Sequence, residues 1–324
     1  MTEDATRTTD RPPGYEDLDV FSQAIADEAL RRGISVEVLD PEMKEMALSR
    51  GGRHVTTIQS LSDLTSAVAF RRCSDKIHSR RVLERAGLHV PAARVATFDE
   101  EDAAFLDEWK EIVVKPARGE QGAGVTARVV DHDRLATALD SAREVCPTVL
   151  LEQRCRGEDV RVLVIGGEVE GAIVRRPPTI TGDGRRTVRE LIEERSRERA
   201  EATDGASHIP VGDETLEVVR ENGFDLETVL AEGKDLTVRS NANVHTGGTS
   251  DNITATLHPH LAEVAVKAAE ATGCPVAGVD LMVPAVDGPD YVIIEVNEQP
   301  GLSADSEHHA VKRFVDLLFP DSDR

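Results

Sequence analysis

The sequence has few cysteines and no long apolar run. Its four cysteines lie far apart and form no C-x-x-C pair, which argues against a zinc site and a disulfide framework. No apolar stretch reaches the length of about 18 residues that a membrane-spanning helix needs. The polar N-terminus predicts no signal peptide, so the reducing cytoplasm is the expected compartment.

Positive charge is also scarce. Lys and Arg number 38 against 60 Asp and Glu, the formal net charge is −22, and only seven of the basic residues are lysines. General nucleic-acid binding needs a basic face, so this charge balance excludes it. Few lysines among many acidic residues indicate a high-salt cytoplasm, where screening weakens the repulsion between like charges. An ordinary acidic cytosolic protein is the alternative interpretation.

The beginning of the chain predicts an arm followed by a short folded segment. We expect residues 1–17 to be a disordered arm and residues 18–60 to be a short N-terminal α/β segment. Apolar spacing predicts a helix over 19–32, and two strands are expected over 34–39 and 53–58. This segment is too short to form a full domain alone.

The rest of the chain mixes helices with β-hairpins, which predicts an α+β fold with two lobes around a cleft. We assign residues 61–152 to the N-terminal lobe and 153–320 to the C-terminal lobe, with an Arg- and Glu-rich insertion at about 182–240. The expected elements are helices over 61–72 and 75–86 (with Ser74 as N-cap), two strands within 111–130, a helix over 131–143, a strand over 148–152, a hairpin over 159–174, helices over 188–202 and 259–272, strands over 276–283 and 291–297, and a last helix ending near Phe319.

A glycine-rich loop joins the two strands within 111–130. Gly119, Gly122 and Gly124 follow a G-x-x-G-x-G spacing, which differs from both the dinucleotide and the P-loop patterns and leads into a strand. Backbone N–H groups at such a tip can fold over phosphates. Lys115 ends the apolar strand before the loop and needs an anionic partner there. The alternative is a plain flexible hairpin with a lysine that reaches solvent.

Three oxygen-bearing side chains lie on two apolar strands near the C-terminus. Asp280 is on the first strand, and Glu295 and Asn297 share one face of the second. If the hairpin tip is at Asp287-Gly288, Asp280 lies opposite Glu295. Three oxygen ligands on one face favour a magnesium site open toward phosphate. An exposed polar face on an edge hairpin is the alternative.

Together these motifs resemble the ATP-grasp superfamily of carboxylate–amine ligases. The resemblance covers residues 60–320 and rests on Lys76 followed in order by VVKPARGEQGAGV, VLLEQRCRGEDVRVLVI, GVD and IIEVNEQPG. The segments GDGRRTVRELI and NANVHTGGT resemble the branch of cyanophycin synthetase and bifunctional glutathione synthetase. RGEQGAGV, HTGGT and NEQPGLS…RFVDLLFP most resemble the N-acetylglutaminylglutamine synthetase branch, whose members carry a longer N-terminal portion.

The resemblance implies an ATP-grasp fold that grips ATP between two α+β lobes. It implies ATP and Mg²⁺ as cofactors, with two ions expected and Mn²⁺ as a substitute. The nucleotide contacts that it implies are Lys76, Lys115, Gly119, Gln121, Gly122, Gly124, Glu152, Gln153, Cys155 and Asp159. The implied metal ligands are Asp280, Glu295 and Asn297, and the implied catalytic residues are Arg161, Arg239 and Asn243.

The resemblance also implies small-molecule carboxylate and amine substrates, and no nucleic-acid or membrane partner. The expected product is a dipeptide osmolyte of the N-acetylglutaminylglutamine type. A cyanophycin- or glutathione-type peptide ligase and a catalytically silent nucleotide-binding protein are the alternatives. Arg175 and Arg176 could bind substrate carboxylates or form surface ion pairs, and His245 could move protons or only hydrogen-bond within its loop. The sequence leaves a homo-oligomer open.

The acidic composition generates a prediction about salt. The Debye length falls from about 10 Å at 0.1 M to about 3 Å at 1 M salt, so like charges on the surface repel each other less. We predict that the melting temperature and the ligase rate both rise between about 0.1 and 2 M KCl. Thermal unfolding and rate measurements along a KCl series check this, and a flat or falling melting curve would contradict the high-salt interpretation.

Overall fold

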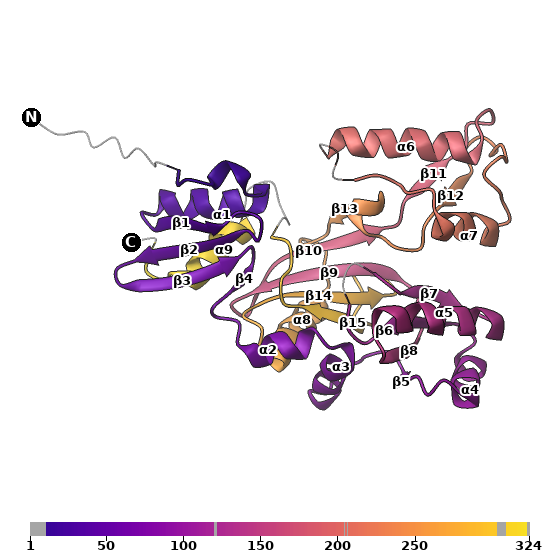
Figure 1. Ribbon diagram of the computed structural model, residues 1–324, viewed down its shortest axis with the longest axis horizontal. Helices are drawn as coiled ribbons and strands as arrows, with labels where there is room; N and C mark the ends of the chain where they lie inside the picture. The colour runs from indigo at the N-terminus through magenta and orange to yellow at the C-terminus, as the bar shows by residue number, and fades with distance from the viewer. Residues whose placement is uncertain (1–10, 120–121, 204, 206, 303–308, 323–324) are drawn as a thin grey trace, which may run out of the picture.

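The computed structural model describes residues 11–119, 122–203, 205, 207–302 and 309–322. Helices alternate with strands, and every strand pair among these residues is antiparallel, which confirms the α+β class. Figure 1 shows an N-terminal unit on the left, a central sheet, a lobe at the lower right and an insertion at the upper right. Within the described ranges, no helix is long and apolar enough to cross a membrane.

The N-terminal unit joins both ends of the chain. Helix α1 (Val20–Arg31) lies over a four-stranded sheet, and the C-terminal helix α9 (His309–Leu318) packs beside it (Figure 1). The strands are β1 (Ser35–Asp40), β2 (Glu45–Arg50), β3 (Arg53–Ile58) and β4 (Leu61–Ser62), in the order β1-β2-β3-β4. Ile25 of α1 and Phe314 of α9 are fully buried in one shared cluster. The first 60 residues therefore obtain their core partly from the last helix.

Several elements differ here from the sequence-based expectations. Strand β2 was not expected, and residues 61–72 do not form one helix: β4 extends the hairpin from β3, and helix α2 covers only Ala67–Cys73. Helix α2 begins there because the Ser66 hydroxyl accepts the N–H of Ala69. Residues 11–17, expected within the arm, include a 3₁₀ turn whose Tyr15 is buried.

The N-cap of the next helix was also predicted one residue too early. Helix α3 spans Lys76–Arg85, and the Asp75 carboxylate accepts the N–H of His78 at 3.1 Å. Ser74 instead ends α2. Asp75 takes this role because Ser74 is already the C-cap of α2. Only these two residues separate α2 from α3, so the two helices form a tight corner.

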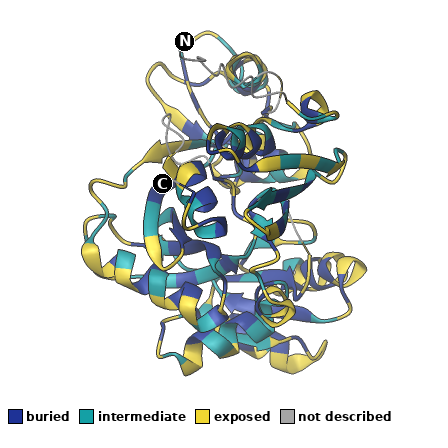
Figure 2. Ribbon diagram, turned by 90° about the vertical axis from the view of Figure 1, so that its left-hand side faces the viewer, coloured by how far each residue is buried: buried dark blue, intermediate teal, exposed yellow. Residues whose placement is uncertain are grey.

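The central sheet separates an apolar face from a polar face. Its order is β13-β10-β9-β14-β15. The strands are β13 (Thr249–Asn252), β10 (Glu168–Arg176), β9 (Glu158–Ile165), β14 (Val276–Val283) and β15 (Val292–Asn297). Helices α2, α3 and α8 (Pro259–Thr272) share one apolar cluster with these strands, part of the buried interior in Figure 2. The other face carries Asp159, Arg161 and Asp280, which belong to the candidate site.

The N-terminal lobe is a second sheet with two helices. Its order is β5-β8-β6-β7. The strands are β5 (Ala93–Val95), β6 (Ile112–Pro116), β7 (Thr126–Val129) and β8 (Val149–Gln153), and the helices are α4 (Glu100–Trp109) and α5 (His132–Val145). Their apolar side chains form a separate cluster, so this lobe has a core of its own.

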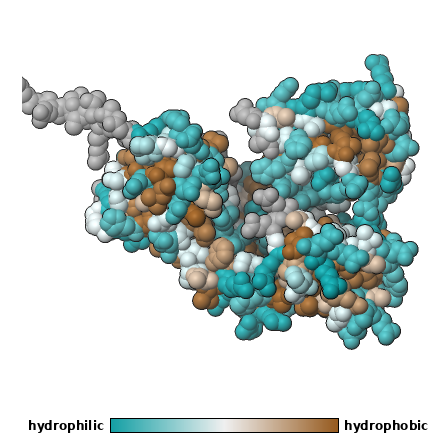
Figure 3. All heavy atoms as spheres, viewed as in Figure 1, coloured by the Kyte–Doolittle hydropathy of each residue, from teal (hydrophilic) through white to brown (hydrophobic). Residues whose placement is uncertain are grey.

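The insertion also has its own apolar core. Strands β11 (Thr179–Thr181) and β12 (Asp235–Thr237) pair, and helices α6 (Val188–Ala202) and α7 (Asp213–Glu221) pack with them around Ile192 and Leu230. Helix α6 starts with a capping box between Thr187 and Glu190, which fixes the first helical residue at Val188, as the sequence predicted. Viewed from the same side as in Figure 1, the surface of the whole molecule is mainly hydrophilic (Figure 3), in keeping with the acidic composition.

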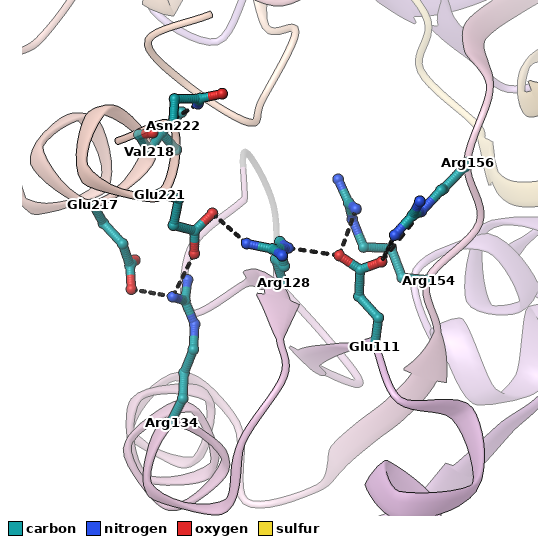
Figure 4. Close-up of polar contacts among 9 residues, drawn as sticks. All are labelled: Glu111, Arg128, Arg134, Arg154, Arg156, Glu217, Val218, Glu221 and Asn222. Carbon is teal, nitrogen blue, oxygen red and sulfur yellow. Dashed lines mark hydrogen bonds and ion pairs between the residues drawn. The ribbon is translucent and has the colours of Figure 1, made fainter. Parts of the chain in front are cut away.

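Ion pairs connect helix α7 of the insertion to the N-terminal lobe. Arg134 of α5 contacts Glu217 and lies 2.8 Å from Glu221, and Arg128 of β7 lies 2.9 Å from Glu221 (Figure 4). We call these three pairs the clasp. It joins two parts that have separate cores, so it fixes their relative position by charge rather than by apolar packing.

Glu111 continues this network to the segment that links the two lobes. Its carboxylate accepts from Arg128 at 2.6 Å, from Arg154 at 2.8 Å and from Arg156 at 2.6 Å (Figure 4). Burial opposes its ionisation, but the bonds from Arg156 and Arg128 outweigh burial and lower the pKa of Glu111 from 4.5 to about 2. Ionised Glu111 therefore stabilises the folded state at neutral pH, and this contribution is lost as the pH falls through about 2.

We predict that removing the clasp opens the molecule. The double variant Glu217→Gln/Glu221→Gln should raise the population of an open form about tenfold, because partly exposed pairs contribute up to about 1 kcal/mol each. Small-angle scattering should then give a larger radius of gyration. The matched control is Glu227→Gln, whose partner Arg189, at 2.9 Å, lies within the insertion. Equal radii for the double variant and this control would show that the clasp does not hold the parts together.

Candidate functional site

A pocket forms where helix α3, the N-terminal lobe and strand β15 meet. Five of its lining residues carry charge, and together they come from all three parts: Lys76 and Arg80 of α3, Lys115 and Glu152 of the N-terminal lobe, and Glu295 of β15. The remaining lining residues are Cys73, Ser79, Leu83, Val90, Ile293 and Ile294. Lys76, Lys115, Glu152 and Glu295 were all singled out from the sequence. The fold thus brings together residues that lie up to 219 positions apart.

Lys115 and Glu152 form a buried ion pair in this pocket. Lys115 Nζ donates to Glu152 Oε1 at 2.7 Å, and the two side chains come from the paired strands β6 and β8. Arg80 of α3 donates to the other carboxylate oxygen at 3.3 Å. Sequence reasoning missed Arg80, because one arginine in the Arg-rich helix α3 carries no distinguishing signal. Glu152 is therefore held from both sides, as a buried charge requires.

The glycine loop lies beside Lys76. Lys76 Nζ donates to the carbonyl oxygen of Gly119 at 3.0 Å. Gly124 has φ +67°, and a Cβ there would lie 2.9 Å from Val145 of α5, so only glycine allows this close approach. Gly122 lies against Asn241, whose Nδ2 would be 3.3 Å from an added Cβ. Gln121, another residue implied by the resemblance, lies outside the described residues.

The link between the two lobes runs along the pocket. The backbone N–H of Gln153, the last residue of β8, donates to the carbonyl oxygen of Ala92 at 2.8 Å. Cys155 is half-buried, and burial raises the pKa of its thiol, with the nearby Glu152 charge acting in the same direction. Gly157 has φ +147°, and a Cβ there would lie 2.3 Å from the carbonyl oxygen of Val283, so the link passes tightly over the end of β14.

A cluster of arginines and carboxylates covers the polar face of the central sheet. Arg161 of β9 binds Asp280 of β14 with two hydrogen bonds, of 2.7 and 2.8 Å. Arg175 of β10 lies 3.2 Å from Asp280 and 2.5 Å from Asp159. Strand register causes this arrangement, since Asp280 pairs with Arg161 and Arg175 with Asp159.

The structure also separates the two arginines that the sequence left undecided. Arg175 joins the cluster, whereas Arg176 is exposed and pairs with Asp251 at 2.9 Å. Alternation along β10 explains the difference, because consecutive residues point to opposite faces.

The pKa values of the two carboxylates in the cluster, Asp280 and Asp159, shift in opposite directions. Burial opposes the charged form of Asp280, but the charges of Arg175 and Arg161 outweigh it and lower its pKa. For Asp159, burial dominates over Arg175 and raises the pKa. Asp280 is therefore the carboxylate that is held firmly as an anion.

The three expected metal ligands lie side by side at the edge of the central sheet. Asp280 pairs with Glu295 in the register, as the hairpin argument predicted, and Asn297 Nδ2 lies 3.3 Å from Asp280 Oδ2. Asp280 is 6% exposed, and β15 is an edge strand. Within the described part of the chain, no group of three or more His, Cys, Asp or Glu side chains is placed to hold a metal ion. The candidate set is two carboxylates and an amide.

This donor set fits a hard cation. Carboxylate and amide oxygens are the ligands that Mg²⁺ takes, and each carboxylate oxygen can accept more than one partner. Arg161 and Arg175 occupy part of the Asp280 capacity, and Glu295 faces the pocket. The fit therefore depends on Glu295, on a rotated Asn297 amide and on Asp280 Oδ1, which accepts one hydrogen bond, from Arg161 Nε.

Two of the expected catalytic residues, Arg239 and Asn243, are not among the residues that line the pocket. The Arg239 guanidinium is buried in the insertion, where it contacts Glu214 and donates to Thr215 at 3.2 Å. Asn243 caps a 3₁₀ turn (Val244–Thr246) by accepting the N–H of His245 at 2.9 Å. That turn belongs to the segment 241–248, which meets the glycine loop through Asn241 and Gly122.

Comparisons with known proteins place these features in a family. A model of the RimK-like ATP-grasp domain matches residues 73–188 and 226–316. A glutathione biosynthesis bifunctional protein from Streptococcus mutans is 28% identical over 306 residues, covering 89% of this chain and 40% of that protein. A cyanophycin synthetase from Geminocystis herdmanii is 31% identical over 281 residues, covering 81% of this chain and 32% of that protein.

A solved structure supports the same fold. The bifunctional glutathione synthetase from Pasteurella multocida superposes with a TM-score of 0.65 at 23% identity, covering 95% of this chain and 44% of that one. The chain thus spans less than half the length of these relatives. The matched family model covers more than half of the chain and includes the pocket, the glycine loop and the Asp280 cluster. The chain therefore belongs to the RimK-like ATP-grasp family.

Proposed function

We propose that this chain joins a carboxylate to an amine at the expense of ATP, through an acyl-phosphate intermediate. The observation that carries the proposal is the pocket in which Lys76, Lys115 and Glu295 converge next to the Asp280 cluster. Two cations on one side and oxygen donors on the other suit a magnesium nucleotide.

In this proposal, the nucleotide lies between the two lobes. Lys76 and Lys115 contact its phosphates, and the glycine loop covers them with backbone N–H groups. Glu152, Gln153 and Cys155 border the adenine, and Asp159 accepts the ribose hydroxyls. Burial raises the pKa of Asp159 although Arg175 lies 2.5 Å away.

Asp280, Glu295 and Asn297 would hold Mg²⁺, with a second ion or Mn²⁺ as finer expectations. When bound, the metal would neutralise phosphate charge. Arg161 and Arg175 keep Asp280 ionised before any ligand arrives, since their charges lower its pKa. They also lie where they can share their donors between Asp280 and a phosphoryl oxygen.

The reaction needs little covalent help from the protein. A substrate carboxylate attacks the γ-phosphorus, the bond to ADP breaks, and an acyl phosphate forms. An amine then attacks the acyl carbon, phosphate leaves, and the amine nitrogen loses a proton to give an amide. Positioning and charge neutralisation by Lys115, Arg161 and the metal ligands account for most of the rate increase.

The substrates are proposed from the relatives, whose names refer to cyanophycin and to glutathione biosynthesis. A peptide-forming ligase is therefore favoured, and an N-acetylglutaminylglutamine-type dipeptide stays a narrower proposal from the sequence motifs alone. ADP release measured with a matrix of amino-acid and peptide carboxylates and amines tests both. Release that requires one carboxylate and one amine supports the proposal, and no release with any pair favours a silent nucleotide-binding protein.

We predict that Asp280→Asn and Glu295→Gln each lower turnover about 100-fold or more, because a lost carboxylate weakens the cation held against phosphate. Steady-state ADP release measures the change, and thermal unfolding checks that the variants fold. Asp287→Asn, at an exposed position of the same hairpin, is the matched control. Turnover within about threefold of the control in both variants would contradict the metal assignment.

We predict that Lys115→Ala weakens ATP binding about tenfold or more and slows acyl-phosphate formation, since a buried phosphate contact is lost. Calorimetric titration gives the affinity, and single-turnover kinetics give the rate. Lys267→Ala, on the exposed side of α8, removes the same charge away from the pocket and serves as control. Unchanged affinity and rate in Lys115→Ala would mean that this lysine is structural.

A further inference from the structure

Two buried cysteines meet at the wall of the pocket. Cys73, the last residue of α2, and Cys274, two residues after α8, are separated by 201 positions, yet their Sγ atoms lie 3.4 Å apart. Both thiols are free, with side chains in residues only 5% and 6% exposed. The other two cysteines, Cys146 and Cys155, take no part in this contact.

The surrounding backbone holds the two sulfurs in place. Arg72 donates to the carbonyl oxygens of Ala271 and Thr272 at 3.3 and 3.2 Å. These hydrogen bonds connect the end of α2, where Cys73 lies, to the end of α8, which precedes Cys274. Gly273, with φ +80°, turns the chain at the end of α8 and brings Cys274 against α2. Because neighbouring residues fix both sides, the contact follows from the packing of α2 on α8.

We propose that Cys73 and Cys274 form a redox-active thiol pair, which a small peroxide converts to an internal disulfide that fixes the corner between α2 and α3. A disulfide needs an S–S distance of about 2.05 Å, so the sulfurs must approach by roughly 1.3 Å from their 3.4 Å separation. Cys73 also lines the pocket and is in contact with Cys274, so a small oxidant that enters the pocket reaches Cys274 past Cys73.

The chemistry of the pair assigns different roles to the two sulfurs. Either thiol can donate in the contact between the two sulfurs; when Cys73 donates, the hydrogen bond lowers the pKa of Cys274 and raises that of Cys73. Cys274 is thus the first thiolate. The Cys274 thiolate attacks one peroxide oxygen, and the O–O bond breaks. The other oxygen departs as water, and Cys274 becomes a sulfenic acid. Cys73 then attacks that sulfur, the S–O bond breaks, and a second water leaves. Two thiols lose two electrons, and one peroxide becomes two waters.

The disulfide would act on the pocket through Lys76. Only Ser74 and Asp75 separate Cys73 from Lys76, whose N–H binds Ala117 and whose Nζ binds Gly119. Disulfide formation moves Cys73 toward Cys274, and it therefore displaces the corner between α2 and α3. This corner positions Lys76 against the glycine loop. This consequence rests on the proposed nucleotide function, whereas formation of the disulfide does not.

Mass spectrometry of the peroxide-treated folded protein tests the pair directly. Trypsin releases Cys73 in the peptide 73–76 and Cys274 in the peptide 268–312, because these segments end at basic residues. We expect the two peptides joined, about 2 Da lighter than their sum, and separated again by dithiothreitol. Separate oxygen adducts on the two cysteines, or two unmodified thiols, would overturn the inference.

Variants and affinity measurements sharpen this test. Cys146→Ala/Cys155→Ala keeps both partners and should still cross-link, while Cys73→Ser should leave a Cys274 sulfenic acid that dimedone traps. Calorimetry should show ATP binding about fivefold or more weaker in the oxidised form. Equal affinity in both forms would overturn the link to Lys76. If the reduced protein binds no ATP at all, the proposed function fails, and the cross-link alone decides this inference.

Discussion

The buried carboxylate of Asp280 is the constraint on which the rest of the site depends. A carboxylate that is 6% exposed is stable as an anion only when cations lie beside it. Arg161 and Arg175 meet this need, but only if β9 pairs with both β10 and β14 in the observed register. A shift of one residue would turn these side chains to the apolar face, against α8. The charge requirement and the apolar core therefore select the same register.

A second constraint concerns how the separate cores are held around the pocket. The N-terminal lobe and the insertion bury their apolar side chains independently, so little apolar area fixes one against the other. The clasp and the Glu111 network supply this connection with charged groups. Ion pairs of this kind are weaker than a packed core and respond to ionic strength. Salt that screens the repulsion between the acidic residues would at the same time weaken the ion pairs of the clasp.

Much of the fold was predictable because local signals were unambiguous. Helices α6 and α8 have the predicted bounds, since a capping Thr187 and a final Gly273 mark their ends. Asp280 opposite Glu295 followed from the hairpin geometry. The errors occur where local signals compete. Leu61 and Ser62 fit a helix by spacing but pair with β3, and both Ser74 and Asp75 are good N-caps, so only the corner between α2 and α3 decides between them.

The sequence by itself determined the fold class, the glycine loop and four of the five charged residues that line the pocket, because side-chain type and spacing along one strand or loop carry that information. Only the tertiary structure decided which charges meet. Arg80 reaches Glu152 from another element, Arg175 turns inward while Arg176 turns outward, and Arg239 is engaged within the insertion. Cys73 and Cys274 meet across 201 residues. Such contacts depend on how helices and sheets pack in space, and no periodicity within a single segment specifies that packing.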